Sequence, residues 1–277
     1  MSKTILLIHG AWLTPLCWGR FKRRYEAAGY EVVAPPWPLM DMSIDQLRTR
    51  PHPKLKKLTI GKLVDHYEKL VRALPESPIL MGHSFGGLVV QKLLDRGLGQ
   101  AGVIFDSVPV GGIVPSLRML RSALPVLLSF FGWNRVFDLE YKHFSETFAQ
   151  TLPEDRRRSF YDRYWVPAPG RIYYQAAIGI GMGIEVGNKD RAPLLLIAGE
   201  KDLTVTPADV DANYRKQQRS PAITSYKSFP DRSHFLCVEP GWEEVADYAL
   251  EWASQHQKNA LSDANVLRRA QARLAIA

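Results

Sequence analysis

The stretch that decides the fold runs from Ile79 to Gly87 and reads Ile-Leu-Met-Gly-His-Ser-Phe-Gly-Gly. Pro78 to Met81 is a short apolar run with the length of a buried strand, and Leu88 to Leu94 has helical spacing. A strand that turns at once into a helix strains the residue at the turn, and flanking glycines let the two elements pass closely. The pattern therefore predicts a strand–turn–helix that holds the Ser84 hydroxyl at the edge of a sheet. A glycine-rich turn with an incidental serine would give the same local pattern. Whether Ser84 is a nucleophile therefore depends on the other motifs of the chain.

The chain on both sides of this stretch alternates between apolar runs and helical patterns. We predict strands at 4–8, 31–34, 78–81, 101–105, 193–198 and 223–229, and helices at 21–28, 59–74, 88–94, 207–219 and 242–257. This alternation is typical of an α/β fold with a doubly wound, mostly parallel sheet that helices cover on both faces.

The alternation breaks between residues 109 and 188, where aromatic residues, prolines and amphipathic pieces replace the strand-like runs. We therefore predict a core of residues 1–108 and 189–257, an inserted helical lid at 109–188 over one end of the sheet, and a C-terminal tail at 258–277. The amphipathic piece from Leu117 to Phe131 fits packing onto the sheet, which is the simpler interpretation, or binding to a lipid interface.

Composition limits the classes of function. The 277 residues are 46% apolar and 23% charged, as in ordinary globular proteins. The net charge is +8, but the basic residues are scattered and not interleaved with aromatics, so we expect no nucleic-acid partner. The longest apolar stretch, Leu124 to Trp133, is interrupted and too short to span a bilayer, so we expect no stable membrane insertion.

Two features bear on the cellular compartment. The two cysteines, Cys17 and Cys237, specify no disulfide framework, and the apolar run near the N-terminus is too short for a signal peptide. We therefore expect a cytoplasmic protein. The sequence leaves open whether it forms a homodimer.

If Ser84 is a nucleophile, it needs a base and an orienting carboxylate. His234 is the candidate base among the seven histidines because it follows the last predicted strand, at the sheet edge where the carboxyl ends of the strands meet. Asp202 and Asp106 each follow an apolar strand. Asp202 is favoured because Gly199 permits a turn toward that edge, which leaves Asp106 as a supporting residue, a pocket residue or a surface turn. The order Ser84, Asp202, His234 is the one expected for a serine triad on such a sheet.

Two backbone amides are candidates for the oxyanion hole. One is the N–H of Phe85, directly after the nucleophile, and the other is the N–H of Ala11, in the loop where Gly10 allows close backbone approach. A simple tight turn is the alternative for that loop. This chemistry requires no metal and no cofactor, and we predict neither.

Together these motifs resemble those of the α/β-hydrolase-fold serine hydrolases, over Thr4 to about Gln257. The motifs are His9-Gly10-Ala11-Trp12, Gly82-His83-Ser84-Phe85-Gly86-Gly87, Gly199-Glu200-Lys201-Asp202 and Ser233-His234-Phe235. The first motif, with Cys17-Trp18, resembles the branch that contains plant methyl-ester esterases and hydroxynitrile lyases. The lyases have a threonine in the first loop and a lysine directly after the catalytic histidine, whereas this chain has Ala11 and Phe235. Ser84 also distinguishes the chain from the family's dehalogenases and epoxide hydrolases, which have an aspartate there.

The resemblance implies a substrate class and an activity. An aromatic lid over the sheet edge favours a small substrate with an apolar or aryl acyl group or an apolar alcohol, and we predict Trp12, Trp133 and Trp165 as substrate contacts. The expected activity is that of a carboxylesterase acting through an acyl-Ser84 intermediate. Alternatives are a lactonase, amidase, thioesterase or C–C bond hydrolase or lyase with the same triad, and a non-catalytic ligand-binding protein of the same fold.

Overall fold

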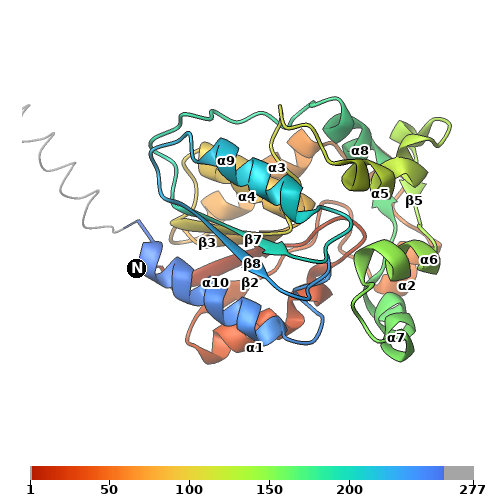
Figure 1. The fold of residues 1–277 in the computed structure, drawn as a ribbon, viewed down its shortest axis with the longest axis horizontal. Helices are drawn as coiled ribbons and strands as arrows, with labels where there is room; N and C mark the ends of the chain where they lie inside the picture. The colour runs from red at the N-terminus through yellow and green to blue at the C-terminus, as the bar shows by residue number, and fades with distance from the viewer. Residues whose placement is uncertain (1, 259–277) are drawn as a thin grey trace, which may run out of the picture.

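The computed structural model describes residues 2–258 and contains one six-stranded sheet (Figure 1). Its strands are β1 (Thr4–Ile8), β2 (Glu31–Val33), β3 (Ile79–His83), β4 (Ala101–Phe105), β7 (Leu194–Gly199) and β8 (Thr224–Phe229). They lie in the order β2-β1-β3-β4-β7-β8, and every neighbouring pair is parallel. The predicted doubly wound α/β sheet is confirmed.

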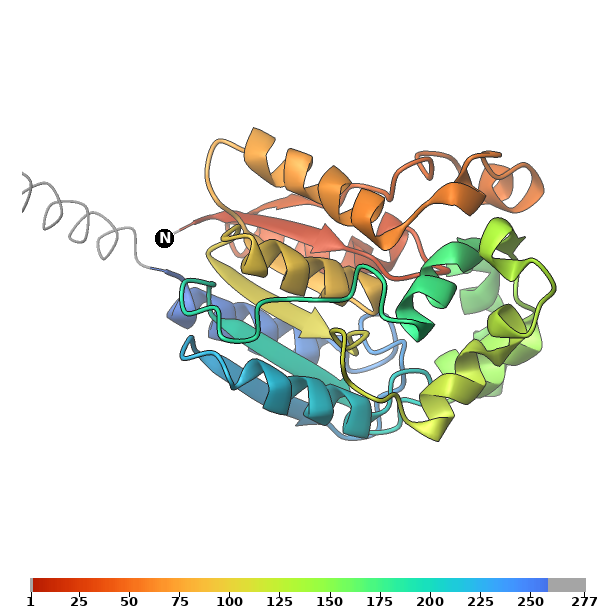
Figure 2. The same cartoon turned by 90° about the horizontal axis from the view of Figure 1, so that it is seen from above.

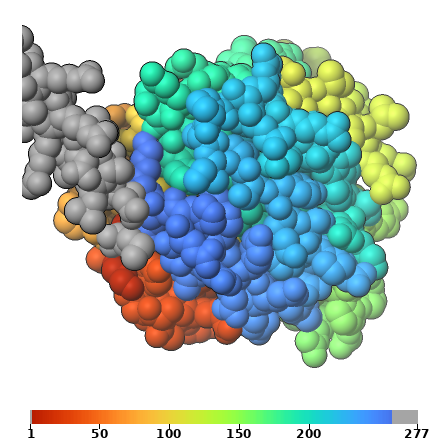
Figure 3. Space-filling view, turned by 60° about the vertical axis from the view of Figure 1, so that its left-hand side comes forward, coloured from red at the N-terminus to blue at the C-terminus, as the bar shows by residue number. Residues whose placement is uncertain are grey.

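Helices cover both faces of this sheet. One face carries α1 (Gly19–Ala27) and α10 (Trp242–His256), and the other carries α3 (Ile60–Ala73), α4 (Phe85–Asp95) and α9 (Pro207–Gln217) (Figures 1 and 2). Figure 3 shows α10 at the surface beside the N-terminal segment, in agreement with its contact with α1. Every residue of β1, β3, β4 and β7 is buried, because both faces of each strand are covered.

Three short elements lie in stretches where the sequence predicts no helix or strand. Helix α2 (Ile44–Thr49) begins with a capping box in which the Ser43 side chain accepts from the Gln46 N–H, while the Gln46 side chain accepts from the Ser43 N–H. A six-residue helix is too short to give a clear periodicity. Two single-turn 3₁₀ helices, η1 (Pro15–Trp18) and η2 (Leu55–Lys57), complete this part of the chain.

The segment 109–188 lies at the carboxyl end of the strands, toward which the arrows of Figure 2 point. Its elements are α5 (Leu117–Leu127), η3 (Gly132–Asn134), β5 (Val136–Phe137), α6 (Tyr141–His143), η4 (Phe144–Phe148), α7 (Glu154–Tyr164), β6 (Ala168–Pro169) and α8 (Gly170–Ala177). The two-residue antiparallel ladder of β5 with β6 was not expected from the sequence. Helix α5 packs on α8, and only its Ser122 and Val126 are buried. Its action as a lid stays a prediction.

The two described ends of the chain meet at the opposite end of the sheet from this segment (Figure 1). The backbone N–H of Ser2 donates to Oε1 of Gln257 at 2.7 Å. The predicted tail, 258–277, lies outside the described residues apart from Lys258. None of the helices within residues 2–258 has both the length and the hydropathy needed to cross a bilayer.

Candidate active site

Ser84 occupies a strained turn between β3 and α4. Its backbone has φ 55° and ψ −120°, in the region that residues with a side chain rarely adopt. A Cβ on Gly82 would stand 2.3 Å from the Gly86 carbonyl oxygen, and a Cβ on Gly86 would stand 2.2 Å from that of Ile8. Only glycine fits at these two positions. The close approach of the backbones at the sharp turn therefore explains the glycines on both sides of Ser84.

The loop after β1 lies directly against this turn. A Cβ on Gly10 would stand 2.7 Å from Cβ of Ser84. Neither the Ala11 N–H nor the Phe85 N–H donates a hydrogen bond to any residue between 2 and 258. Two free amides on adjoining loops beside a serine are what an oxyanion hole requires.

His9 fixes the orientation of the first of these loops. Its Nδ1 donates to the Gly10 carbonyl oxygen at 2.9 Å, and its Nε2 accepts from the Trp37 N–H at 3.2 Å. Burial lowers the pKa of His9 to about 3, so the ring is neutral and this tautomer satisfies both bonds. Because the N–H of a trans peptide points opposite to its C=O, the Ala11 N–H is directed away from His9.

Asp202 and His234 form a buried pair. Nδ1 of His234 donates to Oδ2 of Asp202 at 2.6 Å, and both side chains are inaccessible to solvent. Oδ1 of Asp202 accepts from the N–H groups of Thr204 and Val205 at 2.6 and 3.0 Å, which fixes the carboxylate. Burial lowers the pKa of His234 to about 3, so the ring is neutral and its Nε2 can accept a proton.

His234 lies beside the Ser84 turn, but the hydrogen bond between the two side chains is not formed. Nε2 of His234 has no partner in the described part of the chain. The ring centroid of His234 stands 4.6 Å from that of His83, the residue before Ser84. Hydrogen bonds of this kind often tighten only when substrate binds. The structure thus unites Asp202 with His234, and the triad with Ser84 stays a prediction.

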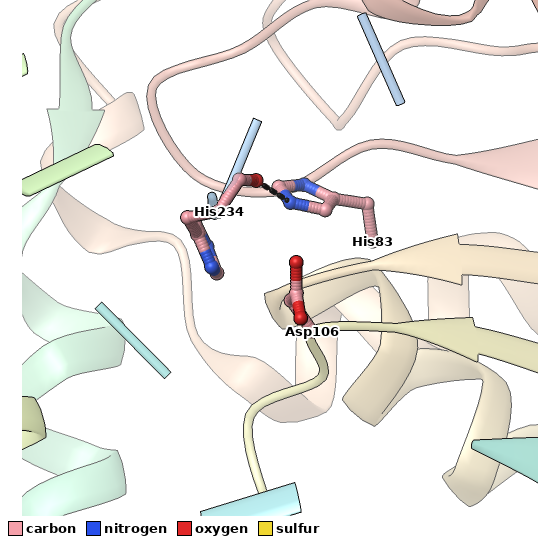
Figure 4. A group of neighbouring side chains, drawn as sticks. All are labelled: His83, Asp106 and His234. Atoms are coloured by element: carbon pink, nitrogen blue, oxygen red, sulfur yellow. Dashed lines mark hydrogen bonds between the residues drawn. The ribbon is translucent and has the colours of Figure 1, made fainter. Parts of the chain in front are cut away.

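His83 has a role that the sequence did not suggest. Its Nε2 donates to the carbonyl oxygen of His234 at 2.7 Å, the dashed line in Figure 4. Burial, and then the neighbouring His234, lower the pKa of His83 well below its usual value. The bond ties the end of β3, directly before Ser84, to the loop of the candidate base.

Asp106 follows β4 and lies next to Asp202. It is fully buried, and its Oδ1 accepts from the Gly199 N–H at 2.7 Å. Burial and the adjacent Asp202 raise the pKa of Asp106 well above its usual value. Through its bond to the Gly199 N–H, Asp106 holds the start of the turn that leads to Asp202, whose own N–H donates to the Gly199 carbonyl oxygen at 3.0 Å. Of the roles that the sequence leaves open, the supporting residue agrees with this arrangement and the surface turn does not.

One group of side chains in this region resembles a metal site. Ligand atoms of His83, Asp106 and His234 lie within 4.8 Å of one another (Figure 4), and two imidazoles with a carboxyl group form a set that transition metals bind. His83 bonds the His234 carbonyl oxygen, Asp106 bonds the Gly199 N–H and His234 bonds Asp202, while Nδ1 of His83, Oδ2 of Asp106 and Nε2 of His234 have no partner in residues 2–258. We assign the group to that pair.

A cavity of about 330 Å³ opens over Ser84 and Phe85. Its wall comes from residues 108–113, from α5, from α8 with the turn that follows it, and from Thr204 and Val205. The only polar side chains on this wall are those of Ser84, Ser122, Tyr173 and Thr204, and none is charged. The cavity therefore fits an uncharged, largely apolar group.

The three predicted substrate contacts lie elsewhere. Trp12 and Trp165 are buried and stack with their ring centroids 5.2 Å apart, and Trp133 is 43% exposed and packs edge-on against Tyr174. None of the three lines the cavity that contains Ser84. Trp12 and Trp165 belong to the buried core between the sheet and the segment 109–188, whereas Trp133 lies at the surface. Tyr173, which packs on both Trp12 and Phe85, reaches the cavity instead.

The sequence analysis also missed Thr204 and Val205 as pocket residues. They directly follow the candidate acid Asp202 and therefore return to the same edge of the sheet. Their closeness in the chain to a candidate catalytic residue was the available signal.

Comparisons with known proteins agree with this fold. Residues 5–248 match the model of the alpha/beta hydrolase family. Methylesterase 8 from Arabidopsis thaliana is 30% identical over 98 residues, which is 35% of this chain and 34% of the relative, so the match spans about a third of the relative's length.

Two solved structures show the same fold. A methylesterase from Arabidopsis superposes with a TM-score of 0.66 at 15% identity and covers 91% of this chain and 98% of its own. A monoacylglycerol lipase from Paleococcus ferrophilus superposes with a TM-score of 0.65 at 18% identity, covering 92% and 95%. The family match extends over most of the chain and includes the Ser84 turn, Asp202 and His234, and the chain therefore belongs to the alpha/beta hydrolase family.

Proposed function

We propose that this protein is a serine esterase that hydrolyses carboxylic esters of small, largely apolar substrates. The observation that carries the proposal is the buried, neutral His234, held by Asp202 at 2.6 Å, beside a serine on a strained turn at the floor of an uncharged cavity. The family match and the similarity to a plant methylesterase support the same class of reaction.

The first half of the reaction forms an acyl-enzyme. Oγ of Ser84 attacks the ester carbonyl carbon while Nε2 of His234 takes the hydroxyl proton. The oxyanion accepts hydrogen bonds from the amides of Phe85 and Ala11. The bond from carbon to the alcohol oxygen then breaks, and the imidazolium of His234 gives its proton to the departing alcohol.

The second half releases the acid. Water gives a proton to His234 and attacks the acyl carbon, the bond to Oγ of Ser84 breaks, and the proton returns from His234 to Ser84. Asp202 stabilises the imidazolium in both halves, and the N–H groups of Thr204 and Val205 keep that carboxylate oriented. No external redox partner enters these steps.

The uncharged wall of the cavity selects the substrate. A charged acyl group would lose its hydration without gaining a partner, which costs several kcal/mol. Short and medium apolar acyl groups, or an apolar alcohol, fit a volume of about 330 Å³.

The test uses two serine variants. Ser84→Ala should lower kcat by about 10³-fold or more and abolish labelling by a fluorophosphonate probe. Ser122→Ala is the matched control, because its hydroxyl lines the same cavity but donates to the Met119 carbonyl oxygen. Unchanged turnover in Ser84→Ala would exclude the mechanism. A panel of aryl esters, lactones, thioesters, amides and β-diketones identifies the bond that is cleaved.

A further inference from the structure

The exposed apolar side chains of this protein gather in one place. Of the thirteen large apolar side chains that are exposed in the described part of the chain, eight belong to residues 114–133 and two to residues 178–180. Val114, Leu117, Leu128, Phe130 and Ile178 are each between 71% and 89% exposed. We call the surface formed by residues 114–133 and 178–180 the apolar face.

The apolar face is one continuous surface. Helix α8, which leads into residues 178–180, contacts both α5 and η3, the elements that carry residues 114–133. Along α5, Leu117, Leu120 and Leu124 recur at intervals of three or four residues and are all exposed, so they form one outward stripe. A surface of this kind on a single chain marks a binding site.

The same surface surrounds the entrance of the cavity over Ser84. Leu120 and Ile178 line that cavity and are themselves 36% and 71% exposed, so they lie at its mouth. Whatever covers the apolar face therefore also covers the route to Ser84.

The charged residues within the apolar face itself are all basic. Arg118, Arg121 and Arg135 are exposed, and none of them forms an ion pair with another residue between 2 and 258. Residues 112–137 and 170–184 contain no aspartate or glutamate. The lysines of η2 add to this charge, because η2 contacts η3. Glu200 shares a neighbouring cleft with Arg118 without pairing to it.

Apolar side chains flanked by unpaired arginines match the boundary between lipid acyl chains and anionic headgroups. A second copy of this chain fits less well, since a two-fold interface would bring the arginines of both copies together without acidic partners. We propose that the apolar face binds peripherally to an anionic lipid surface and so presents the mouth of the cavity to molecules dissolved in it. The binding stands independently of the reaction, whereas its use for substrate uptake rests on the proposed function.

The experiment measures sedimentation with sucrose-loaded vesicles of phosphatidylcholine alone or with phosphatidylglycerol. The inactive Ser84→Ala chain is used throughout, so that binding is measured without turnover. It should bind the mixed vesicles more tightly than the neutral ones and dissociate as the salt concentration rises. Leu117→Ser/Leu128→Ser/Phe130→Ser should weaken binding by about tenfold or more, because three apolar groups no longer enter the lipid.

Two controls separate the contributions. Ile223→Ser removes a side chain that is 52% exposed outside the apolar face, and it should bind like the parent chain. Arg118→Gln/Arg121→Gln should lose the preference for anionic vesicles while keeping weak binding to neutral ones. In the active protein, the triple variant should hydrolyse soluble short esters normally, since none of its three residues lines the cavity.

Two results would overturn the proposal. One is a well-folded parent chain that stays in the supernatant at high vesicle concentration. The other is a dimer in solution that the triple variant converts to a monomer, which would assign the apolar face to a second copy. Vesicle binding without hydrolysis of any ester would leave this inference standing and reject the proposed function, and hydrolysis without vesicle binding would do the reverse.

Discussion

Nε2 of His83 donates a hydrogen bond to the backbone carbonyl oxygen of His234 at 2.7 Å. The two residues are 151 positions apart, and the bond joins the end of β3 to the loop that carries the candidate base. The position of one imidazole thus depends on the side chain of another.

His83→Ala should therefore reduce kcat more than it affects KM. Without the hydrogen bond the His234 loop loses an anchor of about 1–3 kcal/mol, since a buried acceptor is left unsatisfied. We expect kcat to fall about 10-fold to 100-fold with KM within about threefold. Steady-state kinetics on a soluble aryl ester checks this. His256→Ala, which removes a ring bonded to the Trp252 carbonyl at the far end of α10, serves as control. An unchanged kcat in a folded His83→Ala protein would show that the bond does not position the base.

Asp106→Asn and Asp106→Ala should differ in activity. Asn keeps an oxygen that accepts from the Gly199 N–H, so Asp106→Asn should retain activity within about tenfold. Ala leaves the buried Gly199 N–H without an acceptor, which should cost about 1–3 kcal/mol of stability and should lower kcat more than Asn does. Urea unfolding checks the stability of each variant, and kcat/KM between pH 5 and 9 checks its activity. Equal losses in the two variants would show that the hydrogen bond to the Gly199 N–H does not position the Asp202 turn.

Acid should destabilise the protein in part through His9. Its pKa is about 3 in the folded chain, below the ordinary value of 6.5, so the unfolded chain binds an additional proton below pH 6.5. The stability contributed by neutral His9 is therefore present above pH 6.5 and is lost as the pH falls toward 3. In His9→Asn, the slope of the unfolding free energy between pH 6 and 4 should decrease by up to ~1.4 kcal/mol per pH unit. Parallel slopes for the two proteins would contradict the lowered pKa.

Gly86→Ala should destabilise the fold strongly. The new Cβ would stand 2.2 Å from the carbonyl oxygen of Ile8, so β1 and α4 would have to separate. We expect a loss of about 3 kcal/mol or more, measured by thermal or urea unfolding. Gly183→Ala is the matched control, because no atom lies within 4 Å of its Cβ and its φ is not positive. Equal stability of the two variants would mean that the elements do not approach so closely.

Ala123→Leu should shorten the acyl chain that the enzyme accepts. Ala123 lies on the wall of the cavity, and the added side chain removes space that a longer acyl group would occupy. We expect kcat/KM to fall about tenfold or more for long-chain p-nitrophenyl esters and to stay nearly constant for the acetate. An equal loss across the series would place the acyl group elsewhere.

The parts of the molecule that the sequence predicts well are those with a local signature. The four inner strands of the sheet are buried on both faces, which leaves continuous apolar runs such as Leu194–Gly199. The glycines around Ser84 mark a close approach of two backbones, which no other residue tolerates. Asp202 and His234 could be paired in advance because both follow strand ends at one edge of the sheet.

The remaining features depend on tertiary packing and have no such signature. Trp12 and Trp165 could equally have lined a pocket or packed on each other, and only the folded chain shows the stack. The hydrogen bonds of His83 with the His234 carbonyl and of Asp106 with the Gly199 N–H join residues more than 90 positions apart in the sequence. The sequence likewise does not determine whether the apolar side of α5 faces the protein or the solvent, because an amphipathic pattern is compatible with both.

The hydrogen bond between Ser2 and Gln257 has a practical consequence. These residues lie at the end of the sheet remote from the cavity. An affinity tag placed before Ser2 would therefore attach the molecule to a surface by the end opposite the cavity. A protein immobilised in this way on a sensor chip would hold Ser84 and its surroundings toward the flowing solution, where probes and vesicles can reach them.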